Sequence, residues 1–173
     1  MAGQPASEVS LSKSGGNRSA ANKNLIFSLG TEEFGIEVMH IKEIIGMQEI
    51  TVIPNMPPHV KGVINLRGQV IPVIDLSLKF AFAPREYTDR TCIVVVRSQA
   101  NGRERLIGAI ADSVTEVLTI AAEDVEQTPD FGNGAPVPYL LGMAKVRGKV
   151  KLLLDTEEVF SSETILALPP TTN

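Results

Sequence analysis

The side chains best suited to catalysis or metal binding are few and scattered along this chain. Its 173 residues include two histidines, His40 and His59, and one cysteine, Cys92. Neither histidine has a partner at the spacing of a metal-binding motif, and glycine-rich phosphate-binding motifs are absent from the sequence. Cys92 lies in the apolar run TCIVVV, where a small side chain suits a buried strand. The sequence therefore predicts no catalytic residue, no metal site and no cofactor.

Two aspartates that lie eighty residues apart, Asp75 and Asp155, are a further candidate for chemistry. Two carboxyl groups brought together could serve as a general acid and a general base. Each aspartate, however, directly follows a strand-like apolar run, where its carboxylate can cap the element after it. We favour the capping role, and we expect the protein not to be an enzyme.

Both aspartates belong to a sequence motif that occurs twice in the chain, called here the repeated phrase. VKGVINLRGQVIPVIDLSLKF (60–80) returns as LLGMAKVRGKVKLLLDTEEVF (140–160), and both fit the pattern G-x(4)-R-G-x-V-x(4)-D-x(4)-F. In each copy an Arg-Gly pair separates two apolar runs, and glycine at the second position permits the positive φ of a tight hairpin turn. Upstream, Gly35 aligns with Gly108 at an offset of 73, as expected for a duplicated unit with different loop lengths.

The elements that carry these residues are predicted to be short strands. Val, Ile and Leu dominate the apolar residues, and 14 glycines and 11 prolines interrupt them. We expect a disordered tail over 1–23 and a single domain over 24–168, made of two β-barrel subdomains at about 24–85 and 86–165. A unit of ~60 residues buries only ~60% of its unfolded surface, so the two should pack together, with a strand able to cross between them.

Several shorter segments have a less regular sequence pattern. Residues 41–54 mix helical and strand spacing, and the part just before Pro54 favours strand. Pro57 or Pro58 could begin a short helical turn. The 123–138 segment is expected to be a loop, and Asp155 is placed to start a short helix.

The charge of the chain argues against nucleic acid as a partner. The net charge is −4, whereas a phosphate-binding surface is expected to be basic. Aromatic residues, which stack on single-stranded bases, make up only 5%. No apolar run in the sequence reaches the length of a membrane span. We expect a cytoplasmic protein.

Four segments resemble the CheW family of bacterial chemotaxis coupling proteins: IFSLGTEEFGIEV (26–38), IKEIIG (41–46), the first copy of the repeated phrase, and PYLLG (138–142). The resemblance covers roughly residues 24–165. The same module forms the regulatory domain of the histidine kinase CheA. The resemblance implies an all-β fold of two SH3-like five-stranded β-barrels packed on each other, with short helical turns.

The resemblance also implies a function. A family member is a non-enzymatic adaptor that couples the cytoplasmic tips of methyl-accepting chemoreceptors to CheA, supporting kinase control and array assembly. It is recruited to receptor arrays at the inner face of the membrane without inserting directly. A regulatory module cut from a larger signalling enzyme, either CheA or a CheW–receiver fusion, is the alternative. The initiating Met1, the tail and a module that ends near Asn173 favour the free adaptor.

Family surfaces carried onto this chain give the candidate sites. The receptor-binding surface would comprise Ile41, Glu43, Gly62, Asn65, Arg67, Thr91 and Ile93. Glu43 and Arg67 are expected to form a salt bridge across the sheet, although Arg67 could also be a turn residue with no further role. The CheA surface would be apolar strand surface on the second barrel, with no residues assigned.

Overall fold

The computed structural model describes residues 21–100, 102–127 and 139–160. Its strands are β1 (Asn22–Leu29), β2 (Glu32–Glu37), β3 (Ile41–Gly46), β4 (Val60–Leu66), β5 (Gln69–Asp75), β6 (Cys92–Ala100), β7 (Arg103–Ala111), β8 (Ser113–Ile120), β9 (Val125–Glu126), β10 (Leu140–Val146) and β11 (Lys149–Leu154). Its helical segments are η2 (Val38–His40), α2 (Leu76–Lys79), η3 (Ala122–Asp124) and α3 (Thr156–Phe160).

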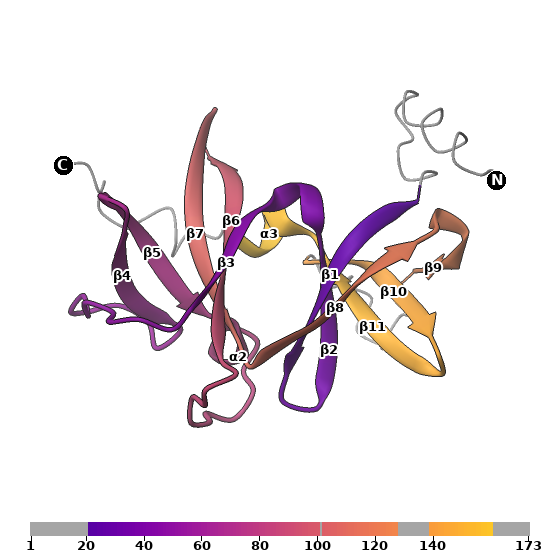
Figure 1. Ribbon diagram of the computed structural model, residues 1–173, viewed down its shortest axis with the longest axis horizontal. Helices are drawn as coiled ribbons and strands as arrows, with labels where there is room; N and C mark the ends of the chain where they lie inside the picture. The colour runs from indigo at the N-terminus through magenta and orange to yellow at the C-terminus, as the bar shows by residue number, and fades with distance from the viewer. Residues whose placement is uncertain (1–20, 101, 128–138, 161–173) are drawn as a thin grey trace.

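These strands form two sheets that lie side by side, with α3 near the middle of the molecule (Figure 1). Barrel 1 has the strand order β3-β6-β7-β5-β4, and barrel 2 has the order β8-β1-β2-β11-β10-β9. The predicted all-β fold of two five-stranded units is confirmed. Barrel 2 gains a sixth strand because the two-residue β9 pairs with β10, whereas barrel 1 has a single bridge between Thr51 and Val63 at the equivalent place.

The sheets do not follow the order of the chain. The N-terminal hairpin β1–β2 pairs with β8 and β11, and the later hairpin β6–β7 pairs with β3 and β5. Each half of the chain thus contributes its first hairpin to the other half's sheet, through the parallel pairs β2–β11 and β5–β7. The division between the sheets therefore does not coincide with the expected boundary near residue 85.

The repeated phrase forms two equivalent hairpins. Arg67 and Gly68 have φ values of 52° and 89°, and Arg147 and Gly148 have 52° and 80°. Positive φ at both central residues is the signature of a type I′ turn, whose twist matches that of the flanking strands. The predicted hairpins are confirmed. Both have a register shift of the same kind just before the repeated glycine, which is Gly62 in one copy and Gly142 in the other.

Both repeated aspartates cap the helix that follows them. The Asp75 Oδ1 atom accepts a hydrogen bond from the Leu78 amide at 3.2 Å. The Asp155 Oδ1 atom accepts from the amides of Glu157 and Glu158 at 3.1 and 3.2 Å. The capping role predicted for the two carboxylates is confirmed, as is the short helix after Asp155.

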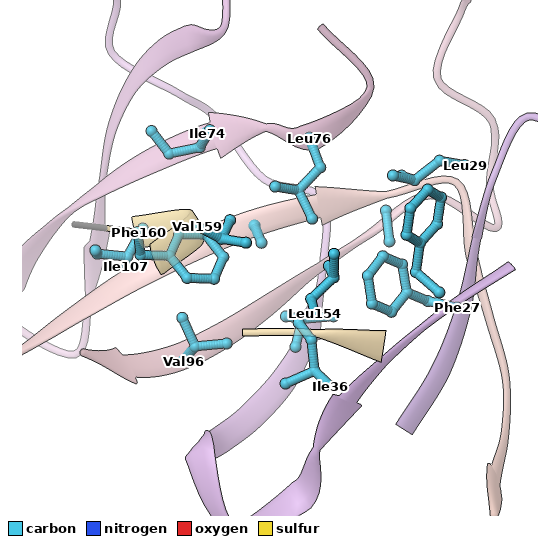
Figure 2. Close-up of a cluster of buried hydrophobic side chains, with 14 of the residues drawn as sticks. Phe27, Leu29, Ile36, Ile74, Leu76, Val96, Ile107, Leu154, Val159 and Phe160 are labelled. Atoms are coloured by element: carbon cyan, nitrogen blue, oxygen red, sulfur yellow. The ribbon is translucent and has the colours of Figure 1, made fainter. Parts of the chain in front are cut away.

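The largest core cluster lies between the two sheets and draws on both (Figure 2). Its labelled members are Phe27, Leu29 and Ile36 of β1 and β2, Ile74 and Leu76 of β5 and α2, Val96 and Ile107 of β6 and β7, and Leu154, Val159 and Phe160 of β11 and α3. Separating the barrels would expose this cluster to water, so it holds them together. Two smaller clusters lie within the individual barrels.

The N-terminal tail and the segments 41–54, 57–60 and 123–138 differ in part from what the sequence predicts. Asn22 and Lys23 already belong to β1, and residues 1–20 of the expected tail lie outside the described residues, as do 128–138 and 161–168. The ambiguous 41–54 segment contains β3 and the Thr51 bridge. The expected loop over 123–138 is wrong at its start, because residues 123–126 belong to η3 and β9. At Pro57 the chain forms a turn instead of a helix, closed by a 3.0 Å hydrogen bond from the Val60 amide to the Pro57 carbonyl.

Candidate functional site

The expected salt bridge between Glu43 and Arg67 is present at one end of barrel 1. Glu43 follows a register shift in β3, and Arg67 occupies the first central position of the β4–β5 turn. Arg67 Nη1 and Nη2 each donate a 2.6 Å hydrogen bond to one carboxylate oxygen of Glu43. This bidentate geometry lowers the pKa of Glu43 and raises the pKa of Arg67. The carboxylate is thereby held ionised and is unsuited to carrying a proton in catalysis.

A cavity of about 480 Å³ opens beside the ion pair. It is lined by Lys42, Glu43, Leu66, Arg67, Gln69 and Leu106. Leu66 and Leu106 supply apolar surface, and the charged groups of Lys42, Glu43 and Arg67 surround it. Such an opening can receive a side chain from a partner protein.

The remaining predicted receptor-site residues divide into two groups. Asn65 is exposed, and its Oδ1 accepts a 2.8 Å hydrogen bond from the Gly68 amide, which stabilises the turn that presents Arg67. Ile41 is half-buried, and its carbonyl accepts a 3.1 Å hydrogen bond from Arg97. Glu43, Asn65 and Arg67 are thus gathered at one place on the surface.

The other three predicted residues are buried. Gly62 packs so closely that a Cβ atom would lie 2.0 Å from the Thr51 carbonyl oxygen. The Thr91 hydroxyl accepts a 2.8 Å hydrogen bond from the Thr88 amide, and Ile93 has no exposed surface. These three residues can shape the surface from beneath, while direct contact with a partner is open to Glu43, Asn65 and Arg67.

Barrel 2 contains an equivalent ion pair, between Arg147 and Glu116, which the sequence motifs did not predict. Arg147 Nη2 donates a 2.8 Å hydrogen bond to Glu116 Oε1, and the pKa of Arg147 is raised as a result. The Gly35–Gly108 offset of 73 also relates Glu43 to Glu116, so the duplication could have located this partner. Arg147 has the same φ as Arg67, 52°.

Exposed apolar side chains accompany both ion pairs. In barrel 1 they are Ile44 and Val70, which are 44% and 38% exposed. In barrel 2 the equivalent residues are Val117 and Val150, which are 53% and 48% exposed. Each barrel therefore has an Arg–Glu pair together with two exposed aliphatic side chains on the strands of the same sheet.

Within the described residues, no three His, Cys, Asp or Glu side chains gather closely enough to hold a metal ion. Cys92 is half-buried at the start of β6, and burial raises the pKa of its thiol, which disfavours the nucleophilic thiolate. None of the helices in 21–100, 102–127 and 139–160 is long and apolar enough to cross a membrane.

Residues 23–164 match the CheW-like domain. The chain belongs to the CheW-like family. Chemotaxis protein CheW of Klebsiella aerogenes is 38% identical over 139 residues, which are 80% of this chain and 81% of that protein. Chemotaxis protein CheW of Rhizobium meliloti is 33% identical, with 80% and 87% covered. The crystal structure of the scaffolding protein TtCheW from Thermoanaerobacter tengcongensis superposes with a TM-score of 0.73 at 30% identity, covering 83% of this CheW-like chain and 90% of that one.

Proposed function

We propose that this protein is a non-enzymatic chemotaxis adaptor that couples the cytoplasmic tips of methyl-accepting chemoreceptors to the CheA histidine kinase, supporting kinase control and array assembly. Its relatives are named chemotaxis and scaffolding proteins. The observation that carries the proposal is the presentation of two separate Arg–Glu surfaces on one CheW-like chain. An adaptor needs two docking surfaces that can be occupied together.

On the receptor side, the proposed surface is the end of barrel 1 around Glu43, Asn65 and Arg67. The adjoining cavity is large enough for a side chain from the receptor's helical hairpin. Ile41, Gly62, Thr91 and Ile93 support this surface through packing and backbone position. Arg67 binds Glu43 through two of its nitrogens, so the ion pair fixes the orientation of the guanidinium group toward a partner.

On the kinase side, the proposed surface is the apolar strand surface of barrel 2 around Val117 and Val150. The regulatory domain of CheA is the same kind of module, so barrel would meet barrel. Contact made mainly by apolar groups should depend weakly on salt, because it contains few charge–charge interactions for salt to screen. A sharp loss of affinity between low and physiological salt would contradict an apolar contact.

The protein would act in the cytoplasm and reach receptor arrays at the inner face of the membrane through its partners, without direct insertion. The test is titration with a receptor cytoplasmic fragment and with the isolated CheA regulatory domain, first separately and then together. We expect each to bind and a ternary complex to form. Competition between the two, or failure of both to bind the folded protein, would refute the adaptor function.

A further inference from the structure

The two barrels are equivalent strand by strand, so the places where they differ in chemistry are informative. Val73 pairs with Gly108 in barrel 1, and Leu153 pairs with Gly35 in barrel 2. Two residues before these pairs, Ile71 of β5 lies at the position of Lys151 in β11. Leu106 of β7 lies at the position of Glu33 in β2. An apolar pair in barrel 1 is thus replaced by a charged pair in barrel 2.

The charged pair forms an ion pair inside barrel 2. Lys151 Nζ donates a hydrogen bond to Glu33 Oε1, and the two residues are directly paired in the register of β11 and β2. Lys151 is only 4% exposed, as buried as a core side chain. An ion pair in such a place is often no more stabilising than apolar residues of similar size, so stability alone gives no reason for it.

The difference falls at the cavity that we assign to the receptor. Leu106 lines the barrel 1 cavity together with Leu66 and Arg67. At the equivalent position barrel 2 has the carboxylate of Glu33, which binds Lys151. Gln69 of the barrel 1 lining corresponds to Lys149 in barrel 2. The apolar Leu106 and the neutral Gln69 of barrel 1 thus correspond to charged residues in barrel 2, whereas Lys42 corresponds to the neutral Thr115.

We propose that Glu33 and Lys151 determine partner specificity by excluding the receptor tip from barrel 2, and this inference rests on the proposed adaptor function. An apolar receptor side chain can pack on Leu106 in barrel 1. In barrel 2 the same side chain would cover the Lys151–Glu33 ion pair. It would remove water from the Glu33 carboxylate oxygen that Lys151 does not bind, without offering that oxygen a hydrogen bond, which is unfavourable. Discrimination by an unfavourable element of this kind is a common route to specificity between similar surfaces. It leaves barrel 2 free for the kinase.

The decisive experiment gives barrel 2 the apolar pair of barrel 1. The variant Glu33→Leu/Lys151→Ile is titrated calorimetrically with the receptor cytoplasmic fragment. We expect the stoichiometry to rise from one fragment per wild-type protein to two. The Arg67→Ala substitution weakens the barrel 1 site. Adding Glu33→Leu/Lys151→Ile to Arg67→Ala should raise the affinity for the receptor fragment at least tenfold above that of Arg67→Ala alone. An unchanged stoichiometry and no restoration would overturn the inference.

The reciprocal variant Leu106→Glu/Ile71→Lys provides a second, independent measurement. It should lose receptor binding at least tenfold and keep the affinity for the CheA regulatory domain, with thermal melts confirming that each protein is folded. Equal receptor binding by this folded variant and the wild type would also overturn the inference. If the wild type itself fails to bind the receptor fragment, the adaptor function fails and the inference falls with it. If the wild type binds one fragment and neither variant changes this, the inference alone is refuted.

Discussion

Replacement of Gly62 by Ala should strongly destabilise barrel 1, although the substitution adds only a methyl group. Gly62 has a φ of 141°, a conformation that side-chain-bearing residues rarely adopt. Its new Cβ atom would lie 2.0 Å from the Thr51 carbonyl oxygen, so the chain at Thr51 must move. That movement would break the hydrogen bonds of 2.8 and 2.9 Å that join Thr51 and Val63.

The expected cost follows from these two effects. A side chain in such a backbone conformation costs about 1–3 kcal/mol, and each lost hydrogen bond about 1 kcal/mol. The sum is roughly 3–5 kcal/mol, which for a chain of this size lowers Tm by about 10 °C. Differential scanning calorimetry measures the change. Gly46→Ala is the control, because a Cβ there meets nothing within 4 Å, and its Tm should stay near that of the wild type. A Gly62→Ala protein as stable as the Gly46→Ala control would refute the reasoning.

Two further predictions concern stability. The pKa of His40 is raised by its hydrogen bond with Glu37, with Asp155 and Glu157 adding to the effect, so protonation of His40 favours the fold. This contribution is present below the ordinary histidine pKa of about 6.5 and disappears as pH rises through the raised value. The Tm difference between wild type and His40→Gln should therefore be larger at about pH 6 than at about pH 8, and a difference independent of pH would contradict this. Asp155→Ala removes the cap of α3 and should cost about 1 kcal/mol in chemical denaturation, whereas an unchanged midpoint would show that the cap contributes nothing.

The turns and helix caps could be predicted from the sequence because local chemistry determines their structure. Arg-Gly pairs between apolar runs predicted both type I′ turns, and the aspartates after those runs predicted both caps. The Glu43–Arg67 pair followed from the family resemblance. For the turns and the caps, a short segment contains the residues that decide the conformation, whereas Glu43 and Arg67 are separated by 24 positions.

The sequence allowed a strand to cross between the barrels, but it did not indicate that a whole hairpin of each half would do so. Whether β1–β2 pairs with β3–β5 or with β8–β11 depends on the parallel pairs β2–β11 and β5–β7, which join distant segments. The Lys151–Glu33 pair was hidden for the same reason, because its partners are separated by 118 positions. Burial of Ile93, predicted as a surface residue, likewise depends on strands that are remote in the sequence.

The central claim is that barrel 1, and not its repeat, carries the receptor surface, and a comparison of Arg67→Ala with Arg147→Ala tests it most directly. The two arginines occupy equivalent turns and bind equivalent glutamates, so each variant controls for the loss of an ion pair. Affinity for the receptor cytoplasmic fragment and for the CheA regulatory domain is measured for both folded variants. We predict that Arg67→Ala weakens receptor binding while kinase-domain binding stays near normal, and that Arg147→Ala leaves receptor binding unchanged. Equal receptor binding by the wild type and a folded Arg67→Ala protein would contradict the claim and leave Arg67 a turn residue.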